Sequence, residues 1–383
     1  MNATKVVDID SHVLEPPDLW IKNIEPRFRD RALRFELDDN GWEYMCVDNA
    51  RHHGYFLDGG IFGRAGAGQP NRPRPLEDYL TPGKVSYEEG RPSGAYDPVE
   101  HIKVLDQRGI DTVILYPTLG LTWETVCPDA ELALVYARVY NDWIIEFCRT
   151  DPSRLACVAH IPVRDVEGAA DEVRRAHRLG CKGIMVYGRP TNDIPYGDPY
   201  FDPLWSVCQE LDMPVSLHAT GNPRCFGNEL YPQADHTVTW WVYMWASEDV
   251  KLGFTTFFQG GVFERFPGFK LVVTESGSGW LAHWLERMDE YYKLFGFTTD
   301  MKMTPTEYFK RQCWIDMEPE EKGALNAIEV MGADRFLWAG DFPHSDSSAD
   351  PLGELMENLS PLSEEDRRKI VGENAVTLYK LGA

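Results

Sequence analysis

Three apolar segments of the chain, each with the pattern of a buried strand, end in residues that commonly bind metal ions. These end residues are Asp10 and His12, His218, and Asp341. Successive residues of a strand point to opposite faces, so Asp10 and His12 project to the same side. Two imidazoles and two carboxylates suit Zn, Fe or Mn, and the set is too rich in nitrogen for a typical Mg or Ca site.

Two further residues follow the same pattern. Glu275 ends the apolar run 270–274, where a carboxylate can bridge two metals, act as a general base, or orient His218 from outside the metal shell. His344 follows Asp341 by three residues and either binds a second metal or caps its loop. The predicted metal ligands are Asp10, His12, His218, Glu275, Asp341 and His344, and the predicted catalytic residues are Glu275, Asp341 and His344.

Other polar residues fit the pattern less well. Glu15 either reaches the site or caps the segment that follows it, and His160 faces either the barrel mouth or the packed interior. Asp316 is a weaker candidate for an outer partner. The remaining histidines are expected to be structural or solvated: His52, His53, His101, His177, His236 and His283. The chain has no G-x-S-x-G turn, which disfavours Ser/His/Asp catalysis.

Composition excludes some classes of partner. The formal net charge is -23, with 61 acidic and 38 basic residues, which argues against nucleic acids and anionic membranes as partners. The eight cysteines include no C-x-x-C pair and indicate reduced thiols. No leader pattern and no apolar run of membrane-spanning length is found, so we expect a cytoplasmic protein that acts on a small molecule.

Strands and helices alternate from residue 98 onward. Strands are predicted at 6–12, 112–116, 155–163, 182–187, 214–218, 270–275, 313–316 and 336–339, and helices at 98–108, 129–148, 167–179, 203–211, 248–266, 280–295, 319–331 and 363–381. Eight apolar strands that alternate with helices predict a (β/α)8 TIM-like barrel, with the active site at the carboxyl ends of the strands. We expect one domain, 1–383.

The first strand is followed by a long insertion, 16–98. Within it, 31–37 and 42–47 alternate apolar and polar residues around Asp39-Asn40-Gly41, which predicts a β-hairpin. Residues 59–98 are rich in Gly, Pro and Arg and are typical of a lid or binding loop. Four arginines of the insertion either meet a carboxylate or phosphate of the substrate or form surface salt bridges: Arg64, Arg72, Arg74 and Arg91.

Several motifs together resemble the amidohydrolase-related family. They are Asp10-Ser11-His12, Tyr96-Asp97-Pro98, Gly109-Ile110-Asp111, the runs 115–118 and 200–205, His218, the run 340–344 and Gly372-Glu373-Asn374-Ala375. That family contains non-oxidative decarboxylases and metal-dependent hydrolases on a (β/α)8 barrel. The resemblance implies Asp10, His12, His218 and Asp341 as metal ligands.

The sequence departs from this family at one position. Characterised members place a histidine at the end of strand six, where this chain has Glu275. Strand four also ends without a lysine that could be carboxylated to bridge two metals. A bridging Glu275 with His344 beside it is similar to a small branch of the family, the dinuclear non-heme iron or manganese/iron monooxygenases.

Three hypotheses follow, and Glu275 and His344 lead us to favour the first. It is a dinuclear iron (or Mn/Fe) monooxygenase that hydroxylates a small organic or acyl substrate. The second is a one-metal hydrolase or non-oxidative decarboxylase of a carboxylic acid. The third is a non-catalytic partner subunit. We expect one or two divalent metals per chain, with Fe or Mn favoured and Zn possible, and a homo-oligomer or a pair with a homologous subunit. Aromatic residues of the loop 219–249 either line an apolar pocket or pack against a partner.

Overall fold

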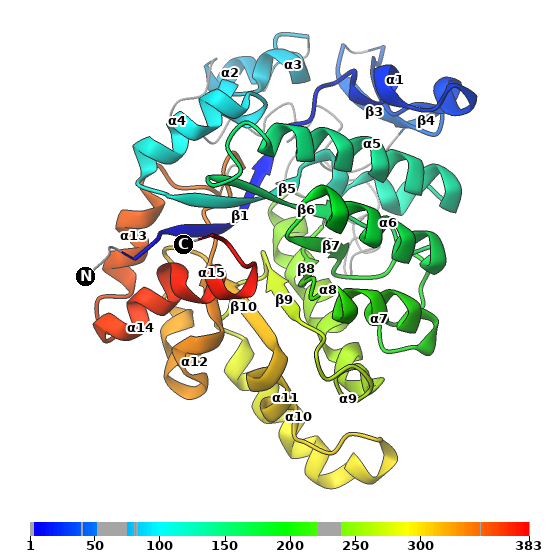
Figure 1. Cartoon of the computed structure of the whole chain (residues 1–383). Helices are drawn as coiled ribbons and strands as arrows, with labels where there is room; N and C mark the ends of the chain where they lie inside the picture. The colour runs from blue at the N-terminus through cyan, green and yellow to red at the C-terminus, as the bar shows by residue number, and fades with distance from the viewer. Residues whose placement is uncertain are drawn as a thin grey trace.

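The computed structural model describes residues 4–39, 41–51, 75–79, 81, 83–220, 239–344 and 346–382. Eight parallel strands form one sheet in sequence order, and helices surround it (Figure 1). The strands are β1 (Val7–Val13), β5 (Thr112–Pro117), β6 (Leu155–His160), β7 (Gly183–Tyr187), β8 (Val215–His218), β9 (Leu271–Thr274), β10 (Cys313–Met317) and β11 (Phe336–Trp338). The predicted (β/α)8 barrel is confirmed.

The sheet closes where the chain leaves β11. The Asp341 N–H donates to the Asp10 carbonyl at 2.9 Å, and the His12 N–H donates to the Phe342 carbonyl at 2.6 Å. These bonds join the last strand to the first and bring two predicted metal ligands to one seam. The ends of the described chain also meet, because Lys5 Nζ donates to the Gly382 carbonyl at 3.0 Å.

The strands are buried on both faces, which explains why they are nearly continuous apolar runs. Inward-facing side chains such as Ile9, Ile114 and Val272 form a core inside the barrel. Tyr379, which lies near the C-terminus, also belongs to this core. A Cβ on Gly183, the first residue of β7, would lie 3.4 Å from the Tyr379 ring. The C-terminal segment therefore closes the amino end of the barrel and leaves the carboxyl end for chemistry.

The helices between the strands follow ordinary capping rules. α4 (Pro98–Arg108) starts at Asp97, whose carboxylate accepts two backbone N–H groups, and ends at Gly109 with φ 69°. The other helices after α4 are α5 (Ala130–Cys148), α6 (Val166–Leu179), α7 (Asp202–Glu210), α8 (Thr239–Gln259), α9 (Val262–Arg265), α10 (Leu281–Phe295), α11 (Pro305–Gln312), α12 (Gly323–Met331), α13 (Pro351–Asn358), α14 (Glu364–Arg368) and α15 (Asn374–Leu378).

Several predicted helix bounds are wrong. The helix predicted at 248–266 begins earlier, as α8, and breaks before α9 at Gly261, whose φ is 70°. The helix predicted at 319–331 begins only at Gly323. The helix predicted at 363–381 is α14, a π-helical turn and α15, and it ends at Leu378. Two helices, α11 and α13, were not predicted, although Thr304 and Glu307 form a capping box at the start of α11.

The segment between β1 and α4 contains the predicted hairpin. β2 (Arg34–Leu37) and β3 (Glu43–Val47) pair antiparallel, and β4 (Ala50–Arg51) extends the sheet. Short helices α1 (Leu19–Asn23), α2 (Leu76–Tyr79) and α3 (Tyr87–Gly90) lie in the same segment. The insertion residues His52, His53, Arg64, Arg72 and Arg74 lie outside the described residues.

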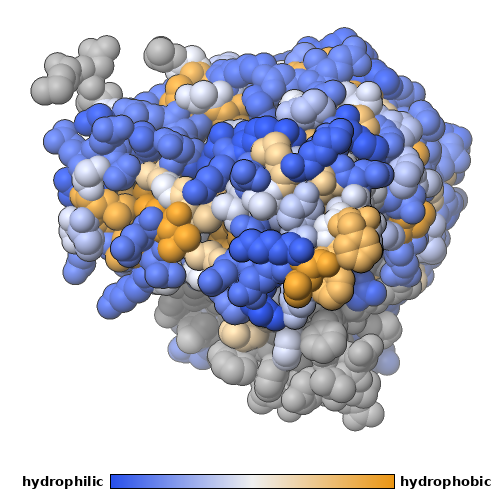
Figure 2. Space-filling view, turned by 90° about the horizontal axis from the view of Figure 1, so that it is seen from below, coloured by the Kyte–Doolittle hydropathy of each residue, from blue (hydrophilic) through white to orange (hydrophobic). Residues whose placement is uncertain are grey.

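The surface and the thiols agree with the composition. On the face shown in Figure 2, hydrophilic residues predominate and hydrophobic ones form separate patches. Among the described residues, no helix is long and apolar enough to cross a membrane. The seven cysteines in the described part of the chain are free and buried, as predicted, and Cys225 lies outside it.

Candidate metal centre

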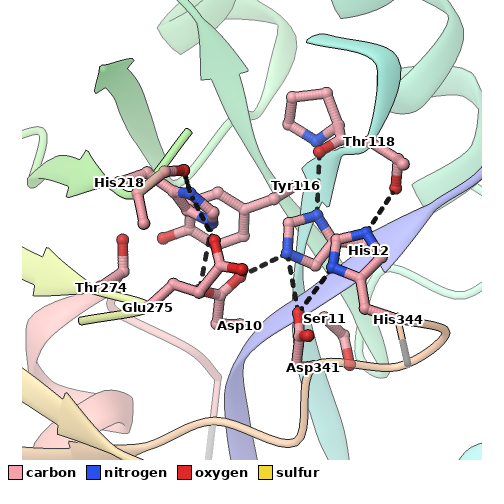
Figure 3. Close-up of polar contacts among 12 residues, drawn as sticks. Asp10, Ser11, His12, Tyr116, Thr118, His218, Thr274, Glu275, Asp341 and His344 are labelled. Atoms are coloured by element: carbon pink, nitrogen blue, oxygen red, sulfur yellow. Dashed lines mark hydrogen bonds and ion pairs between the residues drawn. The ribbon is translucent and has the colours of Figure 1, made fainter. Parts of the chain in front are cut away.

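Side chains at the ends of β1 and β8, and Asp341 just after β11, converge at the carboxyl end of the barrel (Figure 3). His12 Nε2 lies 3.3 Å from Asp10 Oδ1 and 3.1 Å from Asp341 Oδ1. His218 Nε2 lies 3.2 Å from Asp10 Oδ2. Asp10, His12 and His218 are almost completely buried, and Asp341 is 15% exposed. Residues from three distant parts of the sequence thus form one cluster.

Both imidazoles of this cluster are held in one tautomer. His12 Nδ1 donates to the Pro117 carbonyl at 2.8 Å, and His218 Nδ1 donates to the Ala219 carbonyl at 2.5 Å. A carbonyl only accepts hydrogen bonds, so in the neutral ring the Nε2 atom carries the free lone pair. In both residues this atom is directed toward Asp10, which is how histidine ligands to a metal are oriented.

The donor atoms of the cluster fit a divalent cation. Asp10 Oδ1, His12 Nε2, His218 Nε2 and both carboxylate oxygens of Asp341 make no well-formed hydrogen bond with any described residue. Yet His12 Nε2 lies only 3.1–3.3 Å from the Asp10 and Asp341 carboxylates, and His218 Nε2 lies 3.2 Å from Asp10 Oδ2. These polar atoms are therefore close together without being hydrogen-bonded to one another. Unpartnered polar atoms are rare in a protein interior, and a bound cation would satisfy all of them together.

Electrostatics point to the same cation. Burial opposes a charge on His12, but its contacts with Asp10 and Asp341 outweigh burial and raise the pKa of His12 well above its ordinary value. Burial likewise opposes a charge on Asp10, but His218 and His12 hold the pKa of Asp10 below its ordinary value. The metal-free cluster therefore binds a proton tightly, at a place where a divalent cation would supply more positive charge.

Glu275 follows β9 directly and reaches the same cluster. Its Oε2 lies 3.1 Å from His218 Nδ1, and its N–H donates to Asp316 Oδ2 at 3.3 Å. Burial raises the pKa of Glu275 well above its ordinary value, and the nearby Asp341 carboxylate raises it further. Glu275 is thus both an outer partner of His218 and a carboxyl group that readily holds a proton.

His344 also lies in the cluster. Its ring stacks on that of His12, with the centroids 3.9 Å apart. Its Nδ1 is 3.0 Å from Asp341 Oδ1, and its Nε2 is 2.9 Å from Thr118 Oγ1. Burial and the neighbouring His12 lower the pKa of His344 well below its ordinary value. His344 is therefore a buried imidazole that favours its neutral form and can offer a lone pair.

A small acidic cavity opens beside these residues. Its volume is about 30 Å³, and it is lined by Asp10, Glu275, Asp316, Glu318, Pro319, Glu320, Ala339, Gly340, Asp341, Asp346 and Ser348. Ligand atoms of Glu275, Asp341 and Asp346 lie within 4.8 Å of one another. Asp346 was not among the predicted site residues, because it lies in a loop five residues beyond Asp341 with no strand to place it. The negative charge of these carboxylates attracts cations and repels an anion whose charge is not offset.

Other candidates have different roles. The Glu15 carboxylate accepts the N–H groups of Leu119 and Gly120, so it caps the turn that follows β5 and not the segment that follows Glu15 itself. His160 is buried in the interior, with its Nε2 3.2 Å from Glu124 Oε2. Arg91 is buried and donates to the Leu14 and Glu15 carbonyls, so it is not a surface salt bridge. His236 and the residues 221–238 of the aromatic loop lie outside the described residues.

A cluster of residues suited to bind a metal, placed at the carboxyl end of a (β/α)8 barrel, is typical of a class of metal-dependent enzymes. The family model described as amidohydrolase matches residues 98–381, and the chain belongs to this family. The matched residues include His218, Glu275, Asp341 and His344 but not Asp10 or His12.

The relatives of known function include several decarboxylases and a 2-keto-4-carboxy-3-hexenedioate hydratase. A gamma-resorcylate decarboxylase from Polaromonas sp. is 28% identical over 293 residues, which cover 73% of this chain and 86% of that protein. A 2-amino-3-carboxymuconate-6-semialdehyde decarboxylase from Dictyostelium discoideum is 25% identical over 299 residues, which cover 76% of this chain and 78% of that protein. These relatives agree with the second hypothesis and give no support to the favoured monooxygenase.

Solved structures share the fold over the whole chain. An amidohydrolase from Mycobacterium avium subsp. paratuberculosis superposes with a TM-score of 0.82 at 22% identity, covering 99% of this chain and 100% of that one. The Polaromonas sp. dihydroxybenzoic acid decarboxylase, solved with manganese and an inhibitor, gives 0.67 at 21% identity, covering 100% of this chain and 98% of that one.

Proposed function

We propose that this chain is a metal-dependent enzyme that removes CO2 from a small carboxylic acid without oxidation. The observation that carries the proposal is the convergence of unpartnered donor atoms from Asp10, His12, His218 and Asp341. Family membership and the decarboxylase relatives support the reaction type. The cytoplasmic location, the lid and the oligomeric state remain predictions.

Each residue of the cluster has a task in this proposal. Asp10, His12, His218 and Asp341 would hold one divalent cation, with Mn or Fe favoured. That cation would bind oxygen atoms of the substrate and offset the negative charge that develops as CO2 leaves. The Pro117 carbonyl keeps the His12 ring in the tautomer that presents Nε2. Asp316 holds the backbone of Glu275 in place.

Glu275 would handle the proton. When the bond between the carboxylate and its carbon breaks, the electron pair stays on the carbon, and CO2 leaves. Glu275 would give its proton to that carbon and regain one from solvent, so the net reaction is R–COO⁻ plus H⁺ to R–H plus CO2. Its raised pKa favours the protonated form that this step requires. In this role Glu275 stands where the family resemblance implies a histidine.

The acidic cavity restricts the substrate. Carboxylates surround the site, so an anionic substrate gains a net attraction only when a cation offsets them. The electron pair left on the carbon also needs stabilisation by the rest of the substrate. A small aromatic acid with one carboxylate meets both conditions, and the two Polaromonas sp. decarboxylases are named for acids of this kind.

The experiment compares CO2 release with O2 consumption. Manganese-loaded and iron-loaded protein is incubated with a panel of hydroxylated benzoates, including gamma-resorcylate, both without oxygen and in air. The proposal expects CO2 release that does not need O2, and one deuterium on the product ring when the reaction runs in D2O. His218→Ala is the inactive control. CO2 release that requires O2, or turnover with no CO2, would contradict the proposal.

A second candidate is the dinuclear monooxygenase, and one observation favours it. Ligand atoms of His12, Asp341 and His344 lie within 4.8 Å of one another, beside the group of Asp10, His12 and His218. Asp341 is thus placed to bridge two metals, and hard carboxylates stabilise oxidised iron. Two irons per chain together with substrate-dependent O2 uptake would establish this candidate and remove the decarboxylase.

A further inference from the structure

We propose that Asp8 is a positioning residue that sets the placement of Asp10 relative to Asp341, and thereby the metal affinity of the centre. Asp8 lies on β1 and is completely buried. The inference rests on the metal site of the proposed function but not on the reaction that the site performs.

The position of Asp10 relative to Asp341 depends on the barrel seam, which is the junction between β11 and β1 where the barrel closes. β11 has only three residues, and its ladder is made with β10. On its other side, two backbone bonds to β1 come from the residues after the strand: the Asp341 N–H donates to the Asp10 carbonyl at 2.9 Å, and the Phe342 carbonyl accepts the His12 N–H at 2.6 Å. The metal ligands Asp10 and Asp341 thus face each other across a short junction.

The Asp8 carboxylate bridges both sides of this seam. Its Oδ1 accepts the N–H of Asp10 at 3.1 Å and the N–H of Gly340 at 3.0 Å. Its Oδ2 accepts the Ser11 hydroxyl at 3.0 Å. One carboxylate therefore fixes the peptide of one metal ligand and the peptide immediately before the other.

The local backbone explains why a side chain is needed here. The register between β1 and β5 shifts between Asp8 and Ser11, so β1 is irregular where it approaches the site. Such irregularities re-aim side chains and leave backbone groups without a ladder partner. A Cβ on Gly340 would lie 2.6 Å from Asp8 Oδ2, so the close approach depends on glycine at that position.

Asp8 is not placed as a metal ligand itself. Its two oxygens already accept three hydrogen bonds. Among the described residues, the groups of possible ligand atoms that lie within 4.8 Å of one another include Asp10 and Asp341 but not Asp8. Asp8 therefore acts on the metal through the two ligands that it holds. Partners of this kind typically change metal affinity by 10–100-fold when they are removed.

The test measures Mn²⁺ affinity of the metal-free full chain by competition with a chelator, together with the visible spectrum of the Co²⁺-loaded protein. Asp8→Ala is expected to weaken Mn²⁺ binding by about 10–100-fold and to change the Co²⁺ spectrum. Asp8→Asn keeps an oxygen for both N–H groups, and its amide can donate to Ser11, so its affinity should stay within about threefold of wild type.

Two further variants separate positioning from general destabilisation. Glu172 on α6 is also a completely buried carboxylate, which accepts hydrogen bonds from Asn141, Arg138 and Arg175, and it lies outside the metal cluster. Glu172→Ala should lower the unfolding temperature while it leaves Mn²⁺ affinity unchanged. Gly340→Ala should weaken Mn²⁺ binding, because the new Cβ pushes the Asp8 carboxylate away. The Gly340→Ala variant keeps the proposal testable if Asp8→Ala does not fold.

The outcomes distinguish this inference from the proposed function. Wild-type affinity in Asp8→Ala, or in Gly340→Ala if Asp8→Ala does not fold, would overturn the inference alone. So would equal weakening in Glu172→Ala, and so would Asp8→Asn binding as weakly as Asp8→Ala. A wild-type chain that binds no Mn²⁺ would instead overturn the metal centre and this inference together.

Discussion

Glu275, just after β9, and Asp341, three residues after β11, share the same unusual conformation, each with a φ of 49° in the left-handed region. Both carboxylates reach the cavity beside the metal cluster. Non-glycine residues in this region cost on the order of 1–3 kcal/mol, and they persist where the surrounding structure holds them. Asp316 holds the Glu275 N–H, and the Asp10 carbonyl holds the Asp341 N–H. These hydrogen bonds thus hold two residues in a strained backbone conformation that places their carboxylates at the site.

This backbone strain predicts that, at position 275, a glycine variant is more stable than an alanine variant, which reverses the usual order. Glu275→Gly should be more stable than Glu275→Ala by about 1 kcal/mol, because alanine keeps the Cβ that the left-handed region disfavours. At most positions glycine is the less stable of the two. Urea unfolding of the metal-free variants measures the difference. Equal stabilities, or a more stable alanine variant, would show that no strain is stored at this residue.

Glu275→Gln tests the proposed proton donor. The amide keeps the size and polarity of the side chain but cannot give up a proton, so kcat should fall by about 10²–10⁴-fold while metal content is retained. Because burial raises the pKa of Glu275, the wild-type rate should fall as the pH rises through that pKa. Steady-state kinetics measured over a range of pH, with gamma-resorcylate or another acid that the enzyme converts, test both the fall in kcat and the pH dependence. An unchanged kcat would remove Glu275 from this step.

Glu15→Gln should flatten the pH dependence of stability. Burial raises the pKa of Glu15 from 4.5 to about 7, so the folded chain keeps a proton that the unfolded chain has lost. Stability therefore falls as the pH rises toward 7 and levels off above it. Between pH 5.5 and 8 the wild type should lose about 2 kcal/mol more than the variant. Urea unfolding in a chelator at both pH values measures this, and parallel curves would contradict it.

His344→Ala separates the two candidate functions. In a one-metal decarboxylase, His344 lies beside the centre, so the variant should keep about one metal per chain with an affinity lowered by less than about tenfold. In a dinuclear oxygenase the variant should lose one of two metals. Elemental analysis of both proteins, loaded with the same metal, gives the count. A fall from two metals to one would favour the oxygenase.

The strand ends could be predicted from the sequence because each ligand follows an apolar run. Parallel strands bring their carboxyl ends together, so the order of apolar runs alone places Asp10, His12, His218, Glu275 and Asp341 at one site. His344 could be placed there only because it follows Asp341 so closely. These predictions needed no side-chain geometry.

What the sequence could not reveal depends on backbone geometry. The Pro117 carbonyl orients His12, and the identity of a residue says nothing about where its carbonyl points. The role of Asp8 depends on a shift in strand register that cannot be recognised from the residue pattern. Asp346 reaches the cavity from a loop. The break between α8 and α9 depends on Gly261 adopting a positive φ, which glycine permits but does not require.

Metal content shows whether Asp10, His12, His218 and Asp341 form a metal centre. The chain is purified without chelators, loaded with Mn²⁺, freed of excess metal and analysed beside His218→Ala and His101→Gln. His101 is a buried histidine of α4 that contacts the Gly94 carbonyl, so it serves as the matched control. We expect about one metal per chain in the wild type and in His101→Gln, and far less in His218→Ala. No bound metal in the wild type, or full retention in His218→Ala, would contradict it.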